Sequence, residues 1–445
     1  MTLRKQPLTI LCLFITVSTW AVEMKPWPGE VKPFGMDRYV GKVGTGFTIP
    51  QIDLDDRKDL QVEICPEPKR YMGHPSSVLL DDGKTMVIAY LDHHGYGQIS
   101  WQRSEDAGKT WSERLPLPAG WDETVVTDAR GKLAWLEVPI MYKIDGADGK
   151  QRICIYTAGG SAQTYPARYA VSEDGARTWS RLQPIPFANG PVERSAVLFS
   201  DMIRLKDGSY MATWETLKGT LLKAITRDGI HFSKPETLAT YNKAFLSEGC
   251  FIRSPDGGKI ALLMRENNRR FNSFISFSED EGKTWSKPRE MPGSLTGDRH
   301  QHTYAPTGQL FISFRDQAHE TPTFGDWVGW VGSFEDLEKG NEGRYRLRLK
   351  DEYKGNDCAY PTQHLLPDGT IFAATYGFWE RSKPHYIVGV RLRMEELDGL
   401  YRSLKKKKLE APAAAPGKEE RGRSAGARYC HTPRAEASRE RESAS

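Results

Sequence analysis

Cysteine is scarce in this chain. Its six cysteines are spread over 445 residues, and no two of them form a CxxC pair. This pattern excludes a disulfide framework and predicts mostly buried free thiols, with room for one incidental disulfide. The sequence also lacks an HExxH zinc motif, a Walker loop, a dinucleotide-binding glycine motif and a serine-triad motif. We therefore expect neither a metal ion nor an organic cofactor.

A long apolar run is missing after the first twenty residues. The N-terminus combines a charged start at Arg4 and Lys5, an apolar run over residues 8–17 and small residues ending at Ala21. These features predict a secretory signal over residues 1–21, and a short membrane anchor is the alternative. Because the apolar run is too short for a comfortable span, we expect a secreted or periplasmic protein without a membrane span in the mature chain.

A basic surface is absent from most of the chain, although its formal net charge is +4. From Tyr401 onward there are twelve Lys and Arg against six Glu, so this tail carries +6 and the remaining residues carry about −2. The low apolar content and mixed charge of the tail predict disorder over residues 401–445. The net positive charge of the chain therefore comes from its tail alone, and we expect no nucleic-acid partner.

The sequence does contain a repeated octet of the form S-x-D-x-G-x-T-W. It stands at residues 104–111 and 278–285, with a looser copy at 172–179 and a worn copy from Thr226. The four copies start 68, 54 and 52 residues apart. Repeats with a spacing of this size indicate a solenoid, a propeller or an array. The Asp carboxylate can accept hydrogen bonds from its own turn, the Gly permits a positive φ, and the Thr and Trp are expected to start a strand. We interpret the octet as a structural corner.

A second repeated phrase is a hairpin with D-G or T-G at its turn. Five hairpins of this design occur at residues 77–90, 201–214, 250–264, 302–314 and 363–376, and a variant lies in the unit over 134–180. Six units of four short strands are typical of a propeller. We predict an all-β, six-bladed β-propeller of four-stranded antiparallel blades over residues 71–400. The Pro- and Gly-punctuated arm over residues 22–70 is expected to supply a strand to the last sheet.

Functional side chains of a propeller are expected where the first strand of each blade begins and where the second strand ends, because these points surround the mouth of the central channel. Polar residues that a core would not favour gather there. They are Glu248, Arg265, Asp298, Arg299, His300, Arg315, Asp357, Tyr360, Tyr376, His74, Asp92, His93 and His94, with Arg168 before the looser octet copy at 172–179. Such a set suits an anionic or heavily hydroxylated ligand, since a guanidinium grips a carboxylate with paired hydrogen bonds.

The octets resemble the Asp boxes of the sialidase superfamily, and the six units resemble its six-bladed propeller. The resemblance covers about residues 70–397. The phrases GDRH, ISFRD and CAYP are similar to those of sialidase-like proteins from bacteria that degrade environmental polysaccharides. The resemblance implies an exo-acting glycosidase that acts on glycans.

Two further motifs carry the resemblance to individual residues. The stretch from Glu248 to Arg265 resembles the one with the family's helper glutamate and a substrate-carboxylate arginine, and Ala359-Tyr360-Pro361-Thr362 resembles the one with its nucleophilic tyrosine. The resemblance implies Tyr360 as nucleophile, Glu248 as its base and Arg265 as a carboxylate clamp, with Arg315 as a second clamp. A neutral phenol suits this role because an anionic sugar would repel a carboxylate nucleophile.

The chain departs from the family pattern in its first blade. Gly73-His74-Pro75 stands where the family usually has an Arg-Ile-Pro phrase that supplies the first arginine of a triad. Sialic acid is therefore one possible substrate rather than the expected one, and Arg70, Arg168 or Arg299 are alternatives for the missing charge.

The family's acid/base aspartate in the first-blade loop also has no clear counterpart. Asp92 lies nearest to its place, and His93 or His94 are alternatives because histidine titrates close to neutral pH. These observations together predict a secreted, monomeric, retaining glycoside hydrolase that releases a terminal acidic sugar from a glycan or oligosaccharide. Two alternatives stay open: a non-catalytic propeller that binds glycans or protein, and a polysaccharide lyase in which tyrosine and histidine act as base and acid.

Overall fold

A computed structural model of the chain describes residues 46–410, apart from 66–69, 122–125, 128–132, 135, 158–166 and 191–197. The chain divides into two units, one ending at Arg402 and one beginning at Ser403. The predicted secretory signal, Cys12 and Cys430 lie outside the described residues. The other four cysteines, Cys65, Cys154, Cys250 and Cys358, are buried free thiols, as expected.

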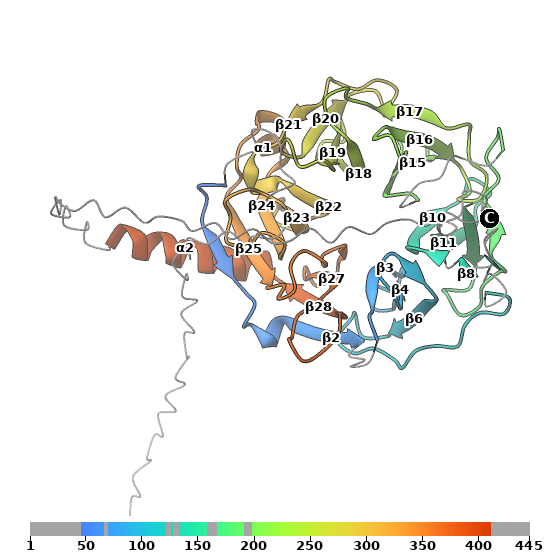
Figure 1. Cartoon of the computed structure of the whole chain (residues 1–445), viewed down its shortest axis with the longest axis horizontal. Helices are drawn as coiled ribbons and strands as arrows, with labels where there is room; N and C mark the ends of the chain where they lie inside the picture. Colours follow the sequence, from blue (N-terminus) through green and yellow to red (C-terminus); the bar gives the residue numbers. More distant parts are fainter. Residues whose placement is uncertain are drawn as a thin grey trace, which may run out of the picture. The chain divides into compact units, whose positions relative to one another are not determined.

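Six sheets surround a central axis, with first strands such as β3, β10, β18 and β22 toward that axis (Figure 1). Blade one contains β3 (Gly73–Leu79), β4 (Met86–Leu91) and β6 (Ile99–Ser104), blade two contains β10 (Ile140–Asp145), β11 (Gln151–Thr157), β12 (Arg168–Ser172) and β13 (Gln183–Pro184), and blade three contains β14 (Asp201–Arg204), β15 (Tyr210–Glu215), β16 (Leu221–Thr226) and β17 (Glu236–Ala239).

The remaining blades follow in chain order, and strands from the N-terminal arm complete two of them. Blade four contains β18 (Leu246–Arg253), β19 (Ile260–Glu266), β20 (Phe274–Ser278) and β21 (Arg289–Glu290), blade five contains β22 (Gly297–Tyr304), β23 (Leu310–Asp316), β24 (Trp327–Gly332), β25 (Tyr345–Lys350) and β1 (Gln51–Asp53), and blade six contains β26 (Thr362–Leu365), β27 (Ile371–Gly377), β28 (Tyr386–Leu392) and β2 (Gln61–Cys65). The predicted six-bladed propeller is confirmed, although blade one has three strands and blade five has five.

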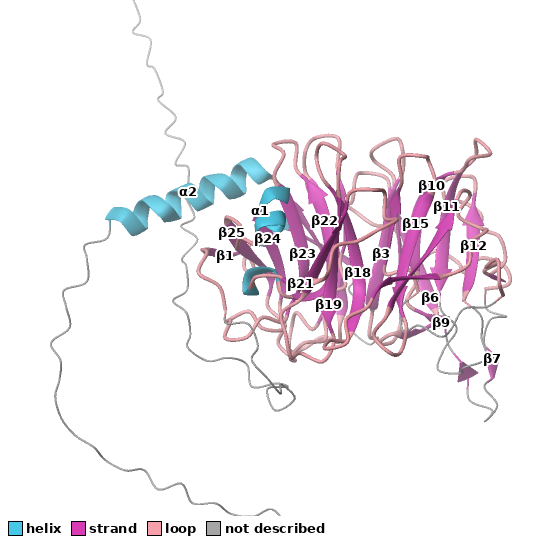
Figure 2. Cartoon of the chain, turned by 90° about the horizontal axis from the view of Figure 1, so that it is seen from above, coloured by secondary structure: helices cyan, strands magenta, loops and turns pink. Residues whose placement is uncertain are grey.

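All six predicted hairpins form the first two strands of their blades, and these strands pair antiparallel. Seen from the side, the strands cross the thickness of the ring and loops cover both edges (Figure 2). The smaller elements are β5 (Tyr96–Gly97) paired with β9 (Leu136–Glu137), β7 (Val126–Thr127) paired with β8 (Leu133–Ala134), the 3-10 turns Lys58–Leu60 and Gly293–Leu295, and helix α1 (Phe334–Lys339).

The N-terminal arm closes the ring. β2 pairs antiparallel with β28, with Val62 opposite Gly389, so a strand of the N-terminal arm completes the last blade as predicted. β1 adds a contact that the sequence did not predict, because it pairs parallel with β25 of blade five. The N-terminal arm therefore contributes one strand to blade five and one strand to blade six.

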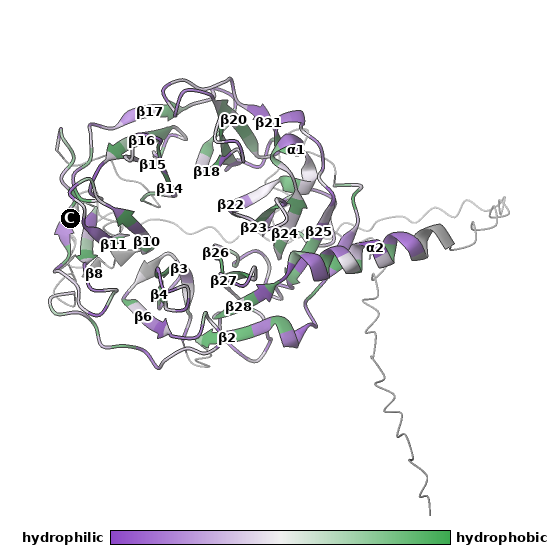
Figure 3. Cartoon of the chain, turned by 180° about the vertical axis from the view of Figure 1, so that it is seen from behind, coloured by the Kyte–Doolittle hydropathy of each residue, from purple (hydrophilic) through white to green (hydrophobic). Residues whose placement is uncertain are grey.

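The hydrophobic core lies between neighbouring blades. Val87 and Trp101 of blade one share a buried cluster with Ile153 and Ile155 of blade two. Similar clusters occupy other blade interfaces, and hydrophobic residues are concentrated on the strands of the ring (Figure 3). Each sheet thus buries its faces against the adjacent sheets, which holds the first strands at fixed positions around the axis.

The octets begin where the third strands of blades one to four end, and they are corners as predicted. In the copy at Ser278, the Asp280 carboxylate accepts hydrogen bonds from the Thr284 N–H at 2.8 Å and hydroxyl at 2.6 Å, and Gly282 has φ of 77°. The expectation that the Trp starts a strand is wrong, because β21 begins at Arg289. Trp285 instead closes the corner by donating from Nε1 to the Gly282 carbonyl at 3.1 Å.

The predicted start of the disordered tail also needs correction. Helix α2 runs Met394–Glu410, so residues 401–410 are helical, and the rest of the tail lies outside the described residues. Within the first unit, Tyr401 stacks on Tyr345 with ring centroids 5.0 Å apart. No helix among the described residues is long and apolar enough to span a bilayer.

Candidate active site

Strained backbone marks the inner strands of three blades. His74 in β3, Glu248 in β18 and Arg299 in β22 have φ values of 55°, 47° and 54°, in the left-handed region that side chains disfavour. The strand register breaks at each of these places, so each residue sits in a bulge. Bulges re-aim side chains, and strain of this kind is concentrated at functional sites. A bulge of the same kind therefore orients the side chains of His74, Glu248 and Arg299 on the inner strands around the axis.

Tyr360 meets Glu248 and Arg265 as the sequence predicted. The phenol oxygen of Tyr360 donates to Glu248 Oε1 at 2.5 Å, and Nη1 of Arg265 lies 2.6 Å from the same carboxylate oxygen and 3.0 Å from the phenol oxygen. Glu248 is 4% exposed, and its second oxygen has no hydrogen-bond partner among the described residues. The three side chains form a hydrogen-bonded group around the buried Glu248 carboxylate.

Burial raises the pKa of Tyr360 to about 12, and the negative charge of Glu248 adds to this effect. The positive charges of Arg265 and Arg315 act in the opposite direction. The phenol is therefore neutral near pH 7, and it becomes a nucleophile only as a base removes its proton. The Glu248 carboxylate lies within hydrogen-bond distance of the phenol.

Asp298 joins the arginines that the sequence assigned to a substrate carboxylate. Its fully buried carboxylate accepts two hydrogen bonds from Arg315, at 2.9 and 2.6 Å, and two from Arg269, at 2.5 and 2.7 Å. Nε of Arg265 lies 3.0 Å from the same group. Burial alone would raise the pKa of Asp298, but the three guanidinium charges hold it well below its usual range. Asp298 is thus an ionised partner of three arginines.

A second cluster centres on Asp357. His94 Nδ1 lies 2.7 Å from its Oδ1, His385 Nε2 lies 3.2 Å from its Oδ2, and the hydroxyls of Tyr71 and Tyr376 donate to it at 3.2 and 3.3 Å. Burial acts to raise the pKa of Asp357, yet the hydrogen bond and charge of His94 bring it well below its usual range. Asp357 thus remains an ionised acceptor for these groups.

His74 connects the two clusters. Its ring packs edge-on to Tyr360 with centroids 5.0 Å apart, and its Nε2 lies 3.2 Å from the Tyr376 hydroxyl. Its Nδ1 accepts from the Gly95 N–H at 3.4 Å, which assigns the ring proton to Nε2. Burial, together with the charge of His94, lowers the pKa of His74 well below its ordinary value. His74 is a neutral imidazole that positions Tyr360.

Two predicted residues of the first-blade loop have different roles. Asp92 accepts a hydrogen bond from the Gln98 N–H at 2.9 Å and lies 3.1 Å from His93 Nδ1, so it organises its own loop. His93 is more than half exposed. His94 alone of the three contacts the Asp357 cluster, and it also lies 3.0 Å from the Tyr71 hydroxyl.

Two other predicted residues are not brought to the phenol. His300 is buried inside blade five, where its Nε2 donates to the Leu295 carbonyl at 3.0 Å and its ring packs on Phe314. Burial lowers the pKa of His300 to about 4. Arg168 opens β12, the third strand of blade two, and no contact between described residues joins it to the Tyr360 group.

Two further carboxyls near the site, the buried Glu215 and the partly buried Asp201, were missed in the sequence. Glu215 ends β15, and its Oε2 accepts from the Glu248 N–H at 3.4 Å, while Asp201 accepts from the N–H groups of Phe251 and Met202 at 2.7 and 2.8 Å. Glu215 stands at the end of a second strand, so the same positional rule that identified Arg265 and Arg315 would have found it. Asp201 begins a first strand and satisfies the rule too.

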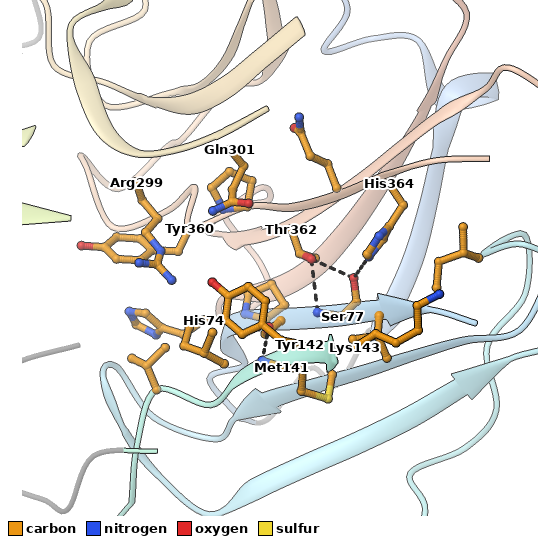
Figure 4. Close-up of a pocket in the computed structure, with 18 of the residues that line it drawn as sticks. His74, Ser77, Met141, Tyr142, Lys143, Arg299, Gln301, Tyr360, Thr362 and His364 are labelled. Carbon is orange, nitrogen blue, oxygen red and sulfur yellow. Dashed lines mark hydrogen bonds between the residues drawn. The ribbon is translucent and has the colours of Figure 1, made fainter. Parts of the chain in front are cut away.

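A cavity of about 400 Å³ extends along the inner strands from Tyr360. Figure 4 shows Arg299, His74 and Tyr360 at one end of this cavity and Lys143 and His364 at the other. No group of three or more His, Cys, Asp or Glu able to hold a metal ion occurs among the described residues. The arrangement supports proton transfer and covalent attack by the chain's own side chains.

Comparison with known proteins gives the same architecture. Residues 61–372 match the family model described as a BNR repeat-like domain. No curated protein matches the sequence. A protein of unknown function from Dyadobacter fermentans is 16% identical, with a TM-score of 0.57 over 75% of this chain and 98% of that one.

Two sialidase structures are also similar. The NanB sialidase from Streptococcus pneumoniae is 14% identical, with a TM-score of 0.53 over 76% of this chain and 71% of that one. The intramolecular trans-sialidase from Ruminococcus gnavus is 16% identical, with a TM-score of 0.51 over 74% of this chain and 95% of that one. Likeness at this level of identity shows a shared fold.

Proposed function

The chain belongs to the family of BNR repeat-like domains and shares the six-bladed fold of the sialidases, and we propose that it is a retaining, exo-acting glycoside hydrolase. The observation that carries the proposal is the 2.5 Å contact between the Tyr360 phenol and the buried Glu248 carboxylate. A nucleophile and base at this distance are the arrangement that covalent catalysis requires. Tyr360 also lines the cavity in which we expect the sugar to bind.

The reaction has two displacements at the anomeric carbon. In the first, the Tyr360 oxygen bonds to that carbon, its proton passes to Glu248, and the bond to the leaving oxygen breaks. In the second, water attacks the same carbon, the bond to the tyrosine oxygen breaks, and Glu248 returns the proton to the phenol. Arg265, 3.0 Å from the phenol oxygen, stabilises the negative charge that develops there. Two inversions leave the anomeric configuration unchanged.

His94 is the residue we assign to the leaving group. It gives a proton to the leaving oxygen in the first step and takes one from water in the second. Its Nδ1 is held 2.7 Å from Asp357, and its side chain is more than half exposed at the mouth, where a leaving group departs. Asp92 is the poorer candidate because its carboxylate hydrogen-bonds within its own loop.

The shape of the site suits a terminal sugar. The cavity runs along the inner strands of blades one, two, five and six, and we propose that it receives the chain end of a glycan. The predicted secretory signal makes glycans or oligosaccharides outside the cytoplasm the expected substrates.

The test is a glycan-library screen in which released free sugars are measured by mass. The parent protein is expected to release a sugar, and Tyr360→Phe and Glu248→Gln are expected to lose at least about 100-fold in kcat, the scale on which acid–base and nucleophilic groups act. Tyr156→Phe is the matched control, because Tyr156 is a buried phenol in blade two that donates to the Gly229 carbonyl. Full turnover by Tyr360→Phe would contradict the mechanism.

The same screen separates the alternatives. A non-catalytic binding propeller shows saturable glycan binding without release, and that binding survives Tyr360→Phe. A lyase gives a product with an unsaturated sugar, detected by its ultraviolet absorbance. Either result would replace the hydrolase proposal.

A further inference from the structure

The arginines that resemble a carboxylate clamp already hold a carboxylate. Arg265, Arg269 and Arg315 all lie within 3.0 Å of Asp298, which is fully buried. Arg265 also pairs with Glu248 at 2.6 Å. An incoming carboxylate at these arginines would have to displace Asp298 and leave that charge buried and unpaired, which is strongly unfavourable. Asp298 therefore occupies the position that a substrate carboxylate would need at these three arginines.

Arg299 is different from its neighbours. It is 6% exposed, its guanidinium forms no hydrogen bond or ion pair with any described residue, and its Nη1 is buried without a partner. A buried charge without a counter-ion is costly, and the left-handed backbone at Arg299, with φ of 54°, adds strain. A bound anion would offset these costs.

The guanidinium of Arg299 lies in the cavity in which we expect the substrate to bind. It lines the same cavity as Tyr360 and His74, and its central carbon lies 6.0 Å from the centroid of the Tyr360 ring (Figure 4). The nearest carboxyls of the inner wall, Asp201 and Glu215, feel its charge but stay outside ion-pair distance. An anionic group bound at Arg299 would therefore lie close to the Tyr360 ring.

We propose that Arg299 binds the carboxylate of an acidic sugar, and that Asp298 closes the Arg265–Arg269–Arg315 cluster to that carboxylate. The inference deepens the proposed function, on which it rests for the position of the sugar ring. It names the substrate class as carboxylated sugars and assigns their recognition to one guanidinium in blade five. A nonulosonic acid and a hexuronic acid both present this chemistry, and the experiment distinguishes them.

The experiment measures binding by calorimetry in a Tyr360→Phe background, so that it does not depend on turnover. The probes are the methyl glycosides of N-acetylneuraminic acid and glucuronic acid, with methyl glucoside as the neutral probe. At least one acid is expected to bind and the neutral probe to bind at least tenfold more weakly. Arg299→Gln should weaken acid binding about 10- to 100-fold, as for the loss of a charged hydrogen bond, and Arg299→Lys should recover part of it.

A second readout separates ligand binding from a structural role. Removing a buried charge that has no partner should raise the melting temperature of the ligand-free protein, so Arg299→Gln is expected to melt higher than the parent. The matched control is Arg152→Gln: Arg152 is also 6% exposed, but it pairs with Asp148 and Glu173. Arg152→Gln should melt lower and bind the acids normally.

Three results would overturn the inference: neither acid binds, acid and neutral probes bind equally, or Arg299→Gln binds the acid as tightly as its background. The proposed function can fail separately. If Arg299-dependent binding is found but the parent releases no sugar from any glycan, the site recognises acidic sugars without hydrolysing them.

Discussion

Glu215 shows how burial sets the protonation of a single residue in the mouth. Burial raises its pKa from 4.5 to about 7, and the charge of Glu248 acts in the same direction. The folded protein therefore holds this proton more tightly than the unfolded chain does. The contribution of Glu215 to stability is full below about pH 4.5 and is lost as the pH rises through about 7.

The variant Glu215→Gln tests this account, because an amide cannot ionise. We expect its melting temperature to exceed that of the parent at pH 8, and the difference to shrink or reverse at pH 5. Thermal melts at both values measure the effect, and Glu236→Gln on β17 is the exposed control. Parallel pH profiles for the parent and Glu215→Gln would show that Glu215 does not titrate in this way.

Individual site residues were predictable where a motif carried them. Tyr360, Glu248 and Arg265 were assigned from motifs and are in mutual contact. The pairing of Asp298 with three arginines was not predictable, because it depends on side chains from two blades meeting within 3 Å. The sequence left the acid–base role open between Asp92, His93 and His94 for a similar reason: all three occupy one loop, and only coordinates show that His94 contacts Asp357.

The closing strand β2 is the element on which the ring depends. Ile64 is 2% exposed and packs with residues of β4, β27 and β28, so it ties the start of the chain to blades one and six. Truncating a buried isoleucine to alanine costs about 2–5 kcal/mol. We expect Ile64→Ala to lower the free energy of unfolding by this amount.

Chemical denaturation measures the effect, and Val62→Ala on the same strand is the control, because Val62 is only partly buried. The control should lose much less stability. If the two variants lose equal free energy of unfolding, the buried Ile64 side chain adds nothing beyond the backbone pairing of β2.

Strands that flank a recognisable hairpin turn in the sequence were predictable, and strands without such a turn were not. The phrase 250–264 has its glycine turn and became β18 and β19. β1 has three residues, no turn of its own, and a parallel partner about 295 positions away in the sequence, so no local pattern identifies it. The bulges in β3, β18 and β22 were also invisible, since a one-residue register break leaves the hydrophobic pattern on either side intact.

At the scale of the whole molecule, the propeller brings together residues that are distant in the chain. Tyr360 and Glu248 are 112 positions apart, yet they share a hydrogen bond because blades four and six face one axis. The sequence predicted this convergence from the fold class alone. What it could not predict was the charge balance of the mouth, in which Asp298 pairs with the expected clamp and Arg299 has no counter-ion among the residues that the structure describes.

The central claim is that the Tyr360 oxygen becomes covalently bound to the sugar during turnover. The most direct measurement is intact-protein mass spectrometry after a rapid acid quench, with a substrate identified in the glycan screen, followed by peptide mapping. The account predicts a mass increase of one sugar residue on the peptide that contains Tyr360, and none in Tyr360→Phe. Turnover with no adduct and with inverted anomeric configuration in the product would contradict it.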